Sequence, residues 1–203
     1  MKITPYSGGS TQTNSYLVET PDGNFLVDAA EGVAAWLDLQ GKRVDDVLLT
    51  HQHFDHVLDA AALQKTGARL HAFAAYSTEL TLEAAARAWG MPIRVEPYRI
   101  DSLLTTDLPL RVAGKELALA HIPGHAPDAV TFYLADSEVV FSGDTLFADS
   151  IGRTDFPGGS TRQLLAGIAR HLLTLPPLTR VLSGHGPATT IGREAAGNPY
   201  LRA

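Results

Sequence analysis

The segment THQHFDH at residues 50–56 constrains this chain more than any other feature. It places three histidines and one aspartate within six positions, directly after the apolar run at 47–49. In an extended segment, side chains two residues apart point the same way. His51, His53 and Asp55 are therefore expected to share one side, with His56 directed elsewhere. This arrangement favours two neighbouring metal ions over a single one.

Chance is a poor explanation for this segment. The chain has eight histidines in 203 residues. Random placement would produce such a pattern in roughly one chain in a thousand, a small false-positive risk for a motif. The alternative of scattered surface histidines is therefore set aside for this stretch.

Three further residues are candidate ligands because each follows a predicted strand. His125 lies in PGHAP at 123–127, and His185 lies in GHGP at 184–187. Glycine and proline fix turns that can direct an imidazole. Asp144, in SGDT at 142–145, can supply the anion that two metals share. Alone, each residue would be read as a loop or turn former, but beside the 50–56 segment each becomes a ligand. His71, His121 and His171 are interpreted as structural.

The remaining pattern predicts strands and helices in two successive sets. Periodicity and turn residues delimit them. Strands are expected at 14–20, 24–28, 44–50, 110–112, 116–122, 130–135, 139–142 and 180–183, with His71 in a further short one. Helices are expected around 33–40, after His56 to Lys65, over 74–89, from Ser160 to the prolines at 176–177, and over 191–197. Ser160 and Gln163 form a capping-box pattern. Sheets with helices on their outer faces follow.

Composition excludes several classes of protein. The net charge of -6 argues against a nucleic-acid partner, which would favour a basic stripe. The chain contains no run of eighteen apolar residues, so no membrane span is predicted. The chain has no cysteine, so thiolate metal sites and disulfides are excluded. The first residues lack the pattern of a signal peptide, and the expected location is the cytoplasm.

Several motifs together resemble a known family. The segments at 50–56, 123–125, 142–147 and 184–186 look like the successive motifs of the metallo-β-lactamase superfamily. The stretch IGRTDFPGG at 151–159 and the tail at 190–201 are similar to small bacterial glyoxalase II-like hydrolases. The resemblance implies an α/β fold, an αββα sandwich with the metal site at one edge of the two sheets.

The resemblance also implies which residue does what. One metal would be held by His51, His53 and His125, and the other by Asp55, His56 and His185. Asp144 would bridge them, so that Asp55 and Asp144 count as catalytic carboxylates. Asp28 would support the metal loops from behind. The expected cofactors are two divalent ions per chain, with zinc preferred and iron or manganese open.

The expected activity is thioester hydrolysis by a metal-bound hydroxide, as in hydroxyacylglutathione hydrolases. The partner would be a small thioester, with glutathione as one possible thiol. Arg153 stands where those enzymes have a lysine and is expected to attract an anionic substrate group; an ordinary ion pair with Asp155 is the alternative. A single domain over 1–203 is expected, without a C-terminal helical glutathione-binding domain. An iron-dependent persulfide dioxygenase, a lactonase or β-lactamase, and a non-catalytic metal-binding module are the other readings.

Overall fold

The strand β2 (Thr13–Thr20) shows why the chain folds into layers. Its residues are buried on both faces along most of its length. Tyr16 and Val18 belong to a cluster shared with the second half of the chain, whereas Leu17 belongs to a cluster beneath helices. Alternate side chains of a strand point to opposite faces. One face of this sheet therefore contacts another sheet, and its other face is covered by helices.

The computed structural model describes residues 1–202 and contains two facing six-stranded sheets. The first follows the order β1-β2-β3-β4-β5-β6, with β1 Lys2–Gly8, β3 Gly23–Val27, β4 Asp46–Leu48, β5 Arg69–Ala72 and β6 Ser102–Leu103. The second follows the order β14-β13-β10-β9-β8-β7, with β7 Leu110–Val112, β8 Lys115–His121, β9 Val130–Leu134, β10 Val139–Gly143, β13 Arg180–Ser183 and β14 Thr189–Thr190. A separate hairpin joins β11 (Leu146–Phe147) to β12 (Ser150–Ile151).

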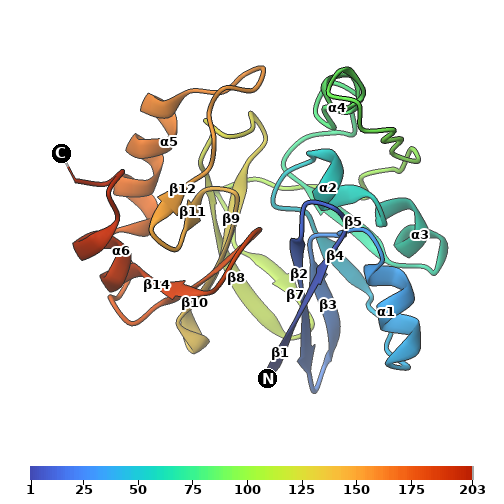
Figure 1. Ribbon diagram of the computed structural model, residues 1–203. Helices are drawn as coiled ribbons and strands as arrows, with labels where there is room; N and C mark the ends of the chain where they lie inside the picture. Colours follow the sequence, from blue (N-terminus) through green and yellow to red (C-terminus); the bar gives the residue numbers. More distant parts are fainter. Residues whose placement is uncertain (203) are drawn as a thin grey trace.

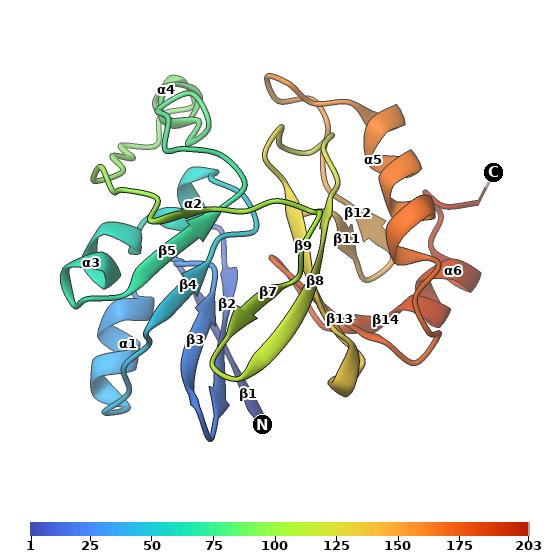
Figure 2. The same ribbon diagram turned by 180° about the vertical axis from the view of Figure 1, so that it is seen from behind.

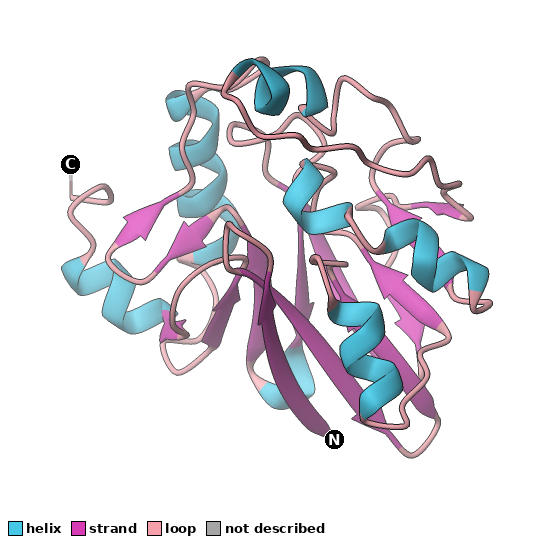
Figure 3. Ribbon diagram, turned by 45° about the vertical axis from the view of Figure 1, so that its right-hand side comes forward, coloured by secondary structure: helices cyan, strands magenta, loops and turns pink. Residues whose placement is uncertain are grey.

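Helices cover the outer face of each sheet, as the blue-to-green and orange-to-red halves of Figure 1 show. The first half carries α1 (Val33–Leu39), α2 (Phe54–Val57), α3 (Ala60–Lys65) and α4 (Glu83–Ala88). The second half carries α5 (Thr161–Gly167), which continues as a wider turn to Leu172, and α6 (Ile191–Gly197). Figures 2 and 3 show the strands between these helices. The predicted αββα sandwich is confirmed. Within residues 1–202, every helix is too short or too polar to cross a membrane.

Three clusters of buried side chains match these layers. The middle one joins both sheets and includes Phe25, Val27, Leu48, Phe132, Phe141 and Leu182. A second cluster lies between the first sheet and its helices, and a third lies between the second sheet and α5 and α6. Apolar burial on both faces of the sheets fixes the strand ends that carry the candidate ligands.

The structure differs from the sequence prediction in one helix that is shorter than expected and in one strand that was missed. Helix was expected over 74–89, but α4 covers only Glu83–Ala88. Before it, Ser77 accepts a hydrogen bond from the Glu79 amide, and Leu82 adopts a left-handed backbone with φ 56°. Side-chain bonding to nearby backbone groups competes with helix formation. The strand β1 was not predicted, because it is a half-exposed edge strand that contains Pro5.

The start of α5 agrees with half of the predicted capping box. The Ser160 hydroxyl accepts a hydrogen bond from the Gln163 amide, as expected. The Ser160 amide, however, donates to the Gly124 carbonyl at 2.8 Å instead of to Gln163. This bond ties the helix to the turn that carries His125.

Candidate metal centre

The segment from His51 to His56 changes conformation midway. It leaves β4 extended, but His53 is the N-cap of α2, whose first residue is Phe54. The expectation that Asp55 shares a side with His51 and His53 was therefore wrong. The helical turn places Asp55 beside His56 and His185 instead. One short segment thus supplies ligands to two separate groups.

The seven predicted ligands come together at one end of the sandwich. His51, His53 and His125 form one group, and Asp55, His56 and His185 form another. Within each group the candidate ligand atoms lie within 4.8 Å of one another. Each segment follows the end of a strand, namely β4, β8, β10 and β13. Parallel pairing of β10 with β13 brings the ends of these two strands to the same edge.

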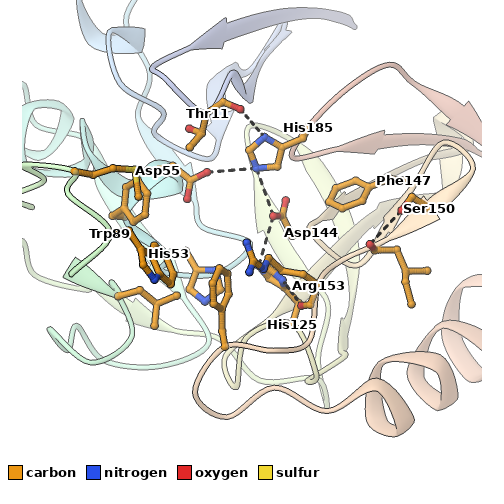
Figure 4. Close-up of a pocket in the computed structure, with 15 residues that line it drawn as sticks. Thr11, His53, Asp55, Trp89, His125, Asp144, Phe147, Ser150, Arg153 and His185 are labelled. Carbon is orange, nitrogen blue, oxygen red and sulfur yellow. Dashed lines mark hydrogen bonds and ion pairs between the residues drawn. The ribbon is translucent and has the colours of Figure 1, made fainter. Parts of the chain in front are cut away.

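Asp144 lies between the two groups. Its Oδ2 is 3.4 Å from the Nε2 atoms of both His125 and His185, and its Oδ1 is 3.4 Å from Nε2 of His56. His56, His51 and Asp144 also form a third potential ligand set. Figure 4 shows the Asp144 carboxylate between His185 and His125. A single carboxylate therefore reaches both groups.

Several of these atoms are buried without a hydrogen-bond partner. They are the Nε2 atoms of His51, His56 and His125 and Oδ1 of Asp144. A buried polar atom without a partner costs about 1–3 kcal/mol. Imidazole and carboxylate groups in clusters of this kind are ligands for divalent metals. The residues present therefore fit a metal centre.

Hydrogen bonds behind the ligands hold the imidazoles with Nε2 facing inward. His125 Nδ1 donates to the Arg153 carbonyl at 2.8 Å, and His185 Nδ1 donates to the Thr11 carbonyl at 3.1 Å. His56 Nδ1 lies 2.9 Å from Asp28 Oδ2. Such outer partners fix the tautomer and the ring orientation of metal-binding histidines. In these three candidate ligands the outer bond occupies Nδ1 and leaves Nε2 as the atom available to a metal ion.

Asp28 organises the first group as well. Its Oδ1 accepts from the Thr50 amide and its Oδ2 accepts from the Thr50 hydroxyl, both at 2.8 Å. The hydroxyl has one proton, so its oxygen is left to accept from His51 Nδ1 at 3.1 Å. Asp28 is 2% exposed and has φ 59°. It contacts His56 directly and reaches His51 through Thr50.

Two glycines permit the close packing around Asp144. A Cβ atom on Gly184 would lie 2.2 Å from Asp144 Oδ1 and 2.6 Å from Cε1 of His56. A Cβ atom on Gly152 would lie 1.9 Å from the Asp144 carbonyl oxygen. A Cβ atom would therefore displace the side chains of Asp144 and His56 at Gly184, and the backbone of Asp144 at Gly152. The glycine before His185 is therefore required by the centre itself.

Burial keeps the imidazoles of the first group neutral. It lowers the pKa of His53 to about 3, and the nearby His125 acts in the same direction. Burial, with the neighbouring histidines, also lowers the pKa of His51 well below its usual value, and burial lowers that of His125. Neutral imidazole is the form that binds metals.

His185 behaves differently because it contacts two carboxylates. Burial acts to lower its pKa, but hydrogen bonds to Asp144 and Asp55 raise it to about 10. The Nε2 to Asp55 Oδ2 distance is 3.3 Å. A metal ion at this place must displace a proton, since the bound ligand is the neutral ring.

The first strands also hold the second group in place. Thr13 donates to Asp55 Oδ2 at 2.7 Å, and its backbone pairs with His185. The Asn14 side chain donates to the carbonyls of Ser183 and Gly186 at 3.1 and 3.0 Å. Sequence reasoning missed these contacts, because they join the beginning of the chain to Asp55 and to a turn about 170 positions later.

A pocket of about 490 Å³ opens above the ligands. His53, Asp55, His125, Asp144 and His185 lie at its floor, and its other lining residues are largely apolar. Figure 4 shows Trp89 on the side of His53, with Phe147 and Ser150 on the opposite side. A concave, mostly apolar site with a few convergent polar groups is typical of a substrate site.

Arg153 lines this pocket and forms an ion pair. Its Nε and Nη2 donate to the two carboxylate oxygens of Asp155, each at 2.7 Å. Its guanidinium also lies 4.2 Å from the centre of the Phe156 ring. The ion pair that the sequence offered as the alternative is present. Attraction of an anionic substrate group by Arg153 stays a prediction.

The three remaining histidines lie outside the metal centre. His71 Nε2 is 2.7 Å from Asp46 Oδ1 in the first sheet. The His121 ring stacks on Phe73, with centroids 4.0 Å apart, and donates to the Pro127 carbonyl. His171 lies in the wider turn after α5. None of the three belongs to a potential ligand group among the described residues.

Asp128 forms a buried hydrogen-bond network with Gln52, the residue between His51 and His53. Its Oδ2 accepts from Gln52 Nε2 at 3.2 Å, and Gln52 Oε1 accepts from the Tyr98 hydroxyl at 3.0 Å. Asp128 Oδ1 is buried without a partner. Burial raises the pKa of Asp128 to about 6, although the Gln52 bond opposes this shift. The charged carboxylate is therefore disfavoured in the folded protein.

Asp128→Asn is expected to stabilise the protein above pH 6. The folded pKa lies above the unfolded value, so the contribution of Asp128 to stability is greatest below about pH 4. It decreases as the pH rises from about 4 to about 6. Asparagine removes this loss but leaves a buried N–H without a partner, for a net gain of about 1–2 kcal/mol at pH 8. Urea unfolding at pH 4 and pH 8 measures both values; equal or lower stability of the variant at pH 8 would contradict the prediction.

Comparison with known proteins agrees with this geometry. Residues 8–185 match the model of the metallo-beta-lactamase superfamily. The chain therefore belongs to the metallo-beta-lactamase superfamily. It is 34% identical over 203 residues to "Probable metallo-hydrolase YqgX" of Bacillus subtilis, covering 95% of this chain and 94% of that protein. It is 35% identical over 159 residues to "Hydroxyacylglutathione hydrolase GloC" of Haemophilus influenzae, covering 76% and 74%.

Solved structures show the same fold over the whole length. The BLEG-1 B3 metallo-beta-lactamase is 35% identical, with a TM-score of 0.89 and full coverage of both chains. TTHA1623, solved in a di-iron-bound form, is 40% identical, with a TM-score of 0.83, covering 98% of this chain and all of that one. The family and its relatives indicate a metal-dependent hydrolase, and the His and Asp groups described above are its candidate metal ligands.

Proposed function

We propose that this protein is a binuclear metal-dependent thioester hydrolase of the glyoxalase II type. The observation that carries the proposal is the Asp144 carboxylate, whose oxygens lie 3.4 Å from histidines of both ligand groups. If only one group held a metal ion, a carboxylate placed between the two groups would have no ligand role toward the second group. Similarity to a protein named hydroxyacylglutathione hydrolase supports the substrate class.

The residues divide into two sets of ligands. His51, His53 and His125 would hold one ion, and Asp55, His56 and His185 the other. Asp144 would contact both. Zinc is the proposed metal, and the di-iron form of a relative keeps iron open. Paired divalent ions supply a hydroxide at neutral pH and stabilise the negative charge that develops on a carbonyl oxygen.

The chain's own residues prepare this site. Asp28 and the carbonyls of Thr11 and Arg153 hold three imidazoles with Nε2 inward. The apolar side chains around the floor exclude water from the reacting groups, which strengthens electrostatic interactions there. The thiolate leaving group needs little protonation, so the mechanism requires no additional acid. None of the described lining residues has to act as a nucleophile.

The main alternative is an iron-dependent persulfide dioxygenase. In that reading one iron would use the positions of His51, His125 and Asp144. A lactonase or β-lactamase is a further alternative, and similarity to a B3 metallo-beta-lactamase keeps it open. One panel separates them: hydrolysis of S-lactoylglutathione, a lactone and a β-lactam, beside oxygen uptake with glutathione persulfide. Thioester hydrolysis without oxygen uptake is expected; oxygen uptake alone would overturn the proposal.

Arg153→Ala tests whether this side chain binds an anionic part of the substrate. If the interaction is equal in the ground and transition states, the variant raises KM and leaves kcat nearly unchanged. Asp155→Asn should do the opposite, because it frees Arg153 from its bidentate partner. We expect KM for S-lactoylglutathione to increase about threefold to tenfold in the first variant and to decrease in the second. Unchanged KM in both variants would exclude the role.

A further inference from the structure

The lining of the pocket contains more apolar surface than the hydrolytic chemistry needs. Leu82, Trp89 and Met91 come from the connection between β5 and β6. Phe147, Ile151 and Phe156 come from the segments that follow β10. Two halves of the chain thus contribute opposite parts of one apolar lining, directly above the metal ligands.

Trp89 and Phe156 join these two halves. Their rings are stacked, with centroids 5.5 Å apart and an interplanar angle of 28°. Trp89 remains 52% exposed, although tryptophan side chains are on average largely buried in folded proteins. We refer to Trp89 and Phe156 as the aromatic wall.

The aromatic wall reaches the metal ligands. The Phe156 ring makes edge contacts with His53 and His125, at centroid distances of 5.4 and 5.9 Å. A carbonyl that reacts at the ligands would therefore have its nearest substituent against Phe156. Atoms farther from the carbonyl would lie along Trp89.

Charged groups are scarce in the same lining. Among the described lining residues outside the ligand set, Arg153 is the only charged side chain. It is already paired with Asp155 and lies over the Phe156 ring. The pocket therefore offers extensive apolar contact close to the ligands and little charge that is not neutralised.

We infer that the aromatic wall binds an apolar acyl group and selects thioesters that carry one. The inference rests on the proposed thioester hydrolysis. In that reaction water adds to the carbonyl, the C–S bond breaks, and the products are a carboxylic acid and a thiol. Each methylene that the wall removes from water strengthens binding about fourfold. A hexanoyl thioester should thus be preferred over a lactoyl thioester of the same thiol.

The test compares S-hexanoylglutathione with S-lactoylglutathione on metal-loaded protein. We expect kcat/KM for hexanoyl to be at least about tenfold higher. Trp89→Ala and Phe156→Ala should each reduce this ratio to about threefold or less. Tyr200→Ala removes another exposed aromatic side chain, which is outside the pocket lining, and should keep the ratio. A ratio near one in the unaltered protein, or a ratio that survives both wall variants, overturns the inference.

A binding measurement keeps this test independent of turnover. The chain has two tryptophans, so Trp36→Phe leaves Trp89 as the only one. Titration of that variant with hexanoate should change its fluorescence saturably, and titration with lactate at the same concentrations should not. Equal responses to both acids contradict the inference. If no thioester is hydrolysed, the proposed function fails, and this titration alone decides whether the wall binds apolar acyl groups.

Discussion

Asp144→Ala is expected to produce the largest loss of function in this protein. The variant removes the carboxylate whose oxygens lie 3.4 Å from histidines of both ligand groups, and it leaves His56, His125 and His185 without their shared partner. Metal content should fall from about two ions per chain to less than one, and thioesterase kcat/KM should fall by at least about a thousandfold. Mass-spectrometric metal analysis and hydrolysis of S-lactoylglutathione measure both effects.

The matched control for this variant is Asp136→Ala. Asp136 is an exposed aspartate in the turn after β9, away from the pocket lining. Its replacement should leave metal content and turnover within experimental error. Full metal content in Asp144→Ala, with circular dichroism showing an intact fold, would contradict the assignment of Asp144 as a ligand.

Asp28→Asn should weaken metal binding without removing a ligand. Asparagine tolerates the left-handed backbone at this position. Its oxygen can still accept from the Thr50 amide, but its NH2 group then faces the donors of Thr50 and His56. Loss of an outer partner typically reduces metal affinity 10-fold to 100-fold, roughly. The displacement of both His51 and His56 places this variant at the upper end of that range.

Competition with a chelator measures the affinity of Asp28→Asn, with Asp136→Asn as control. The variant should lose its metal at a free chelator concentration about a hundredfold lower than the concentration that removes metal from the unaltered protein. The same affinity in both variants would show that Asp28 does not orient the ligands. Because the carboxylate is buried, urea unfolding of the metal-free variant should also show a loss of about 1–3 kcal/mol.

Much of the metal centre could be predicted because each ligand follows an apolar strand. The strand before His51 is recognisable from its buried run, and the glycine-flanked turns after β8 and β13 mark His125 and His185. A chain that packs such strands into two facing sheets brings their ends to one edge. The positions of the seven residues therefore followed from local sequence together with the family resemblance.

The sequence was a poorer guide to which ligand belongs to which of the two groups. An extended segment predicts that Asp55 follows His51 and His53, but the change to helix at Phe54 moves it to the second group. The contact of Thr13 with Asp55 had no local signal, because it depends on how the first hairpin packs against the turn at His185. Tertiary packing of this kind is absent from residue periodicity.

The aromatic wall shows a similar limit. Trp89 was assigned to a long predicted helix, where an aromatic side chain would be read as part of the core. In the structure the helix ends at Ala88, and Trp89 contacts Phe156 across the pocket. Its role depends on a loop that lies about 70 positions away in sequence. Helix propensity alone could not place it.

The number of metal ions in His185→Ala tests the central claim most directly. His185 belongs only to the second ligand group, whereas the three histidines of the first group are untouched. We expect about two ions per chain in the unaltered protein and about one in the variant, with thioesterase activity abolished and the fold retained. One iron bound in both proteins, with full activity in the variant and oxygen consumption with a persulfide, would contradict the two-metal hydrolase and favour the dioxygenase.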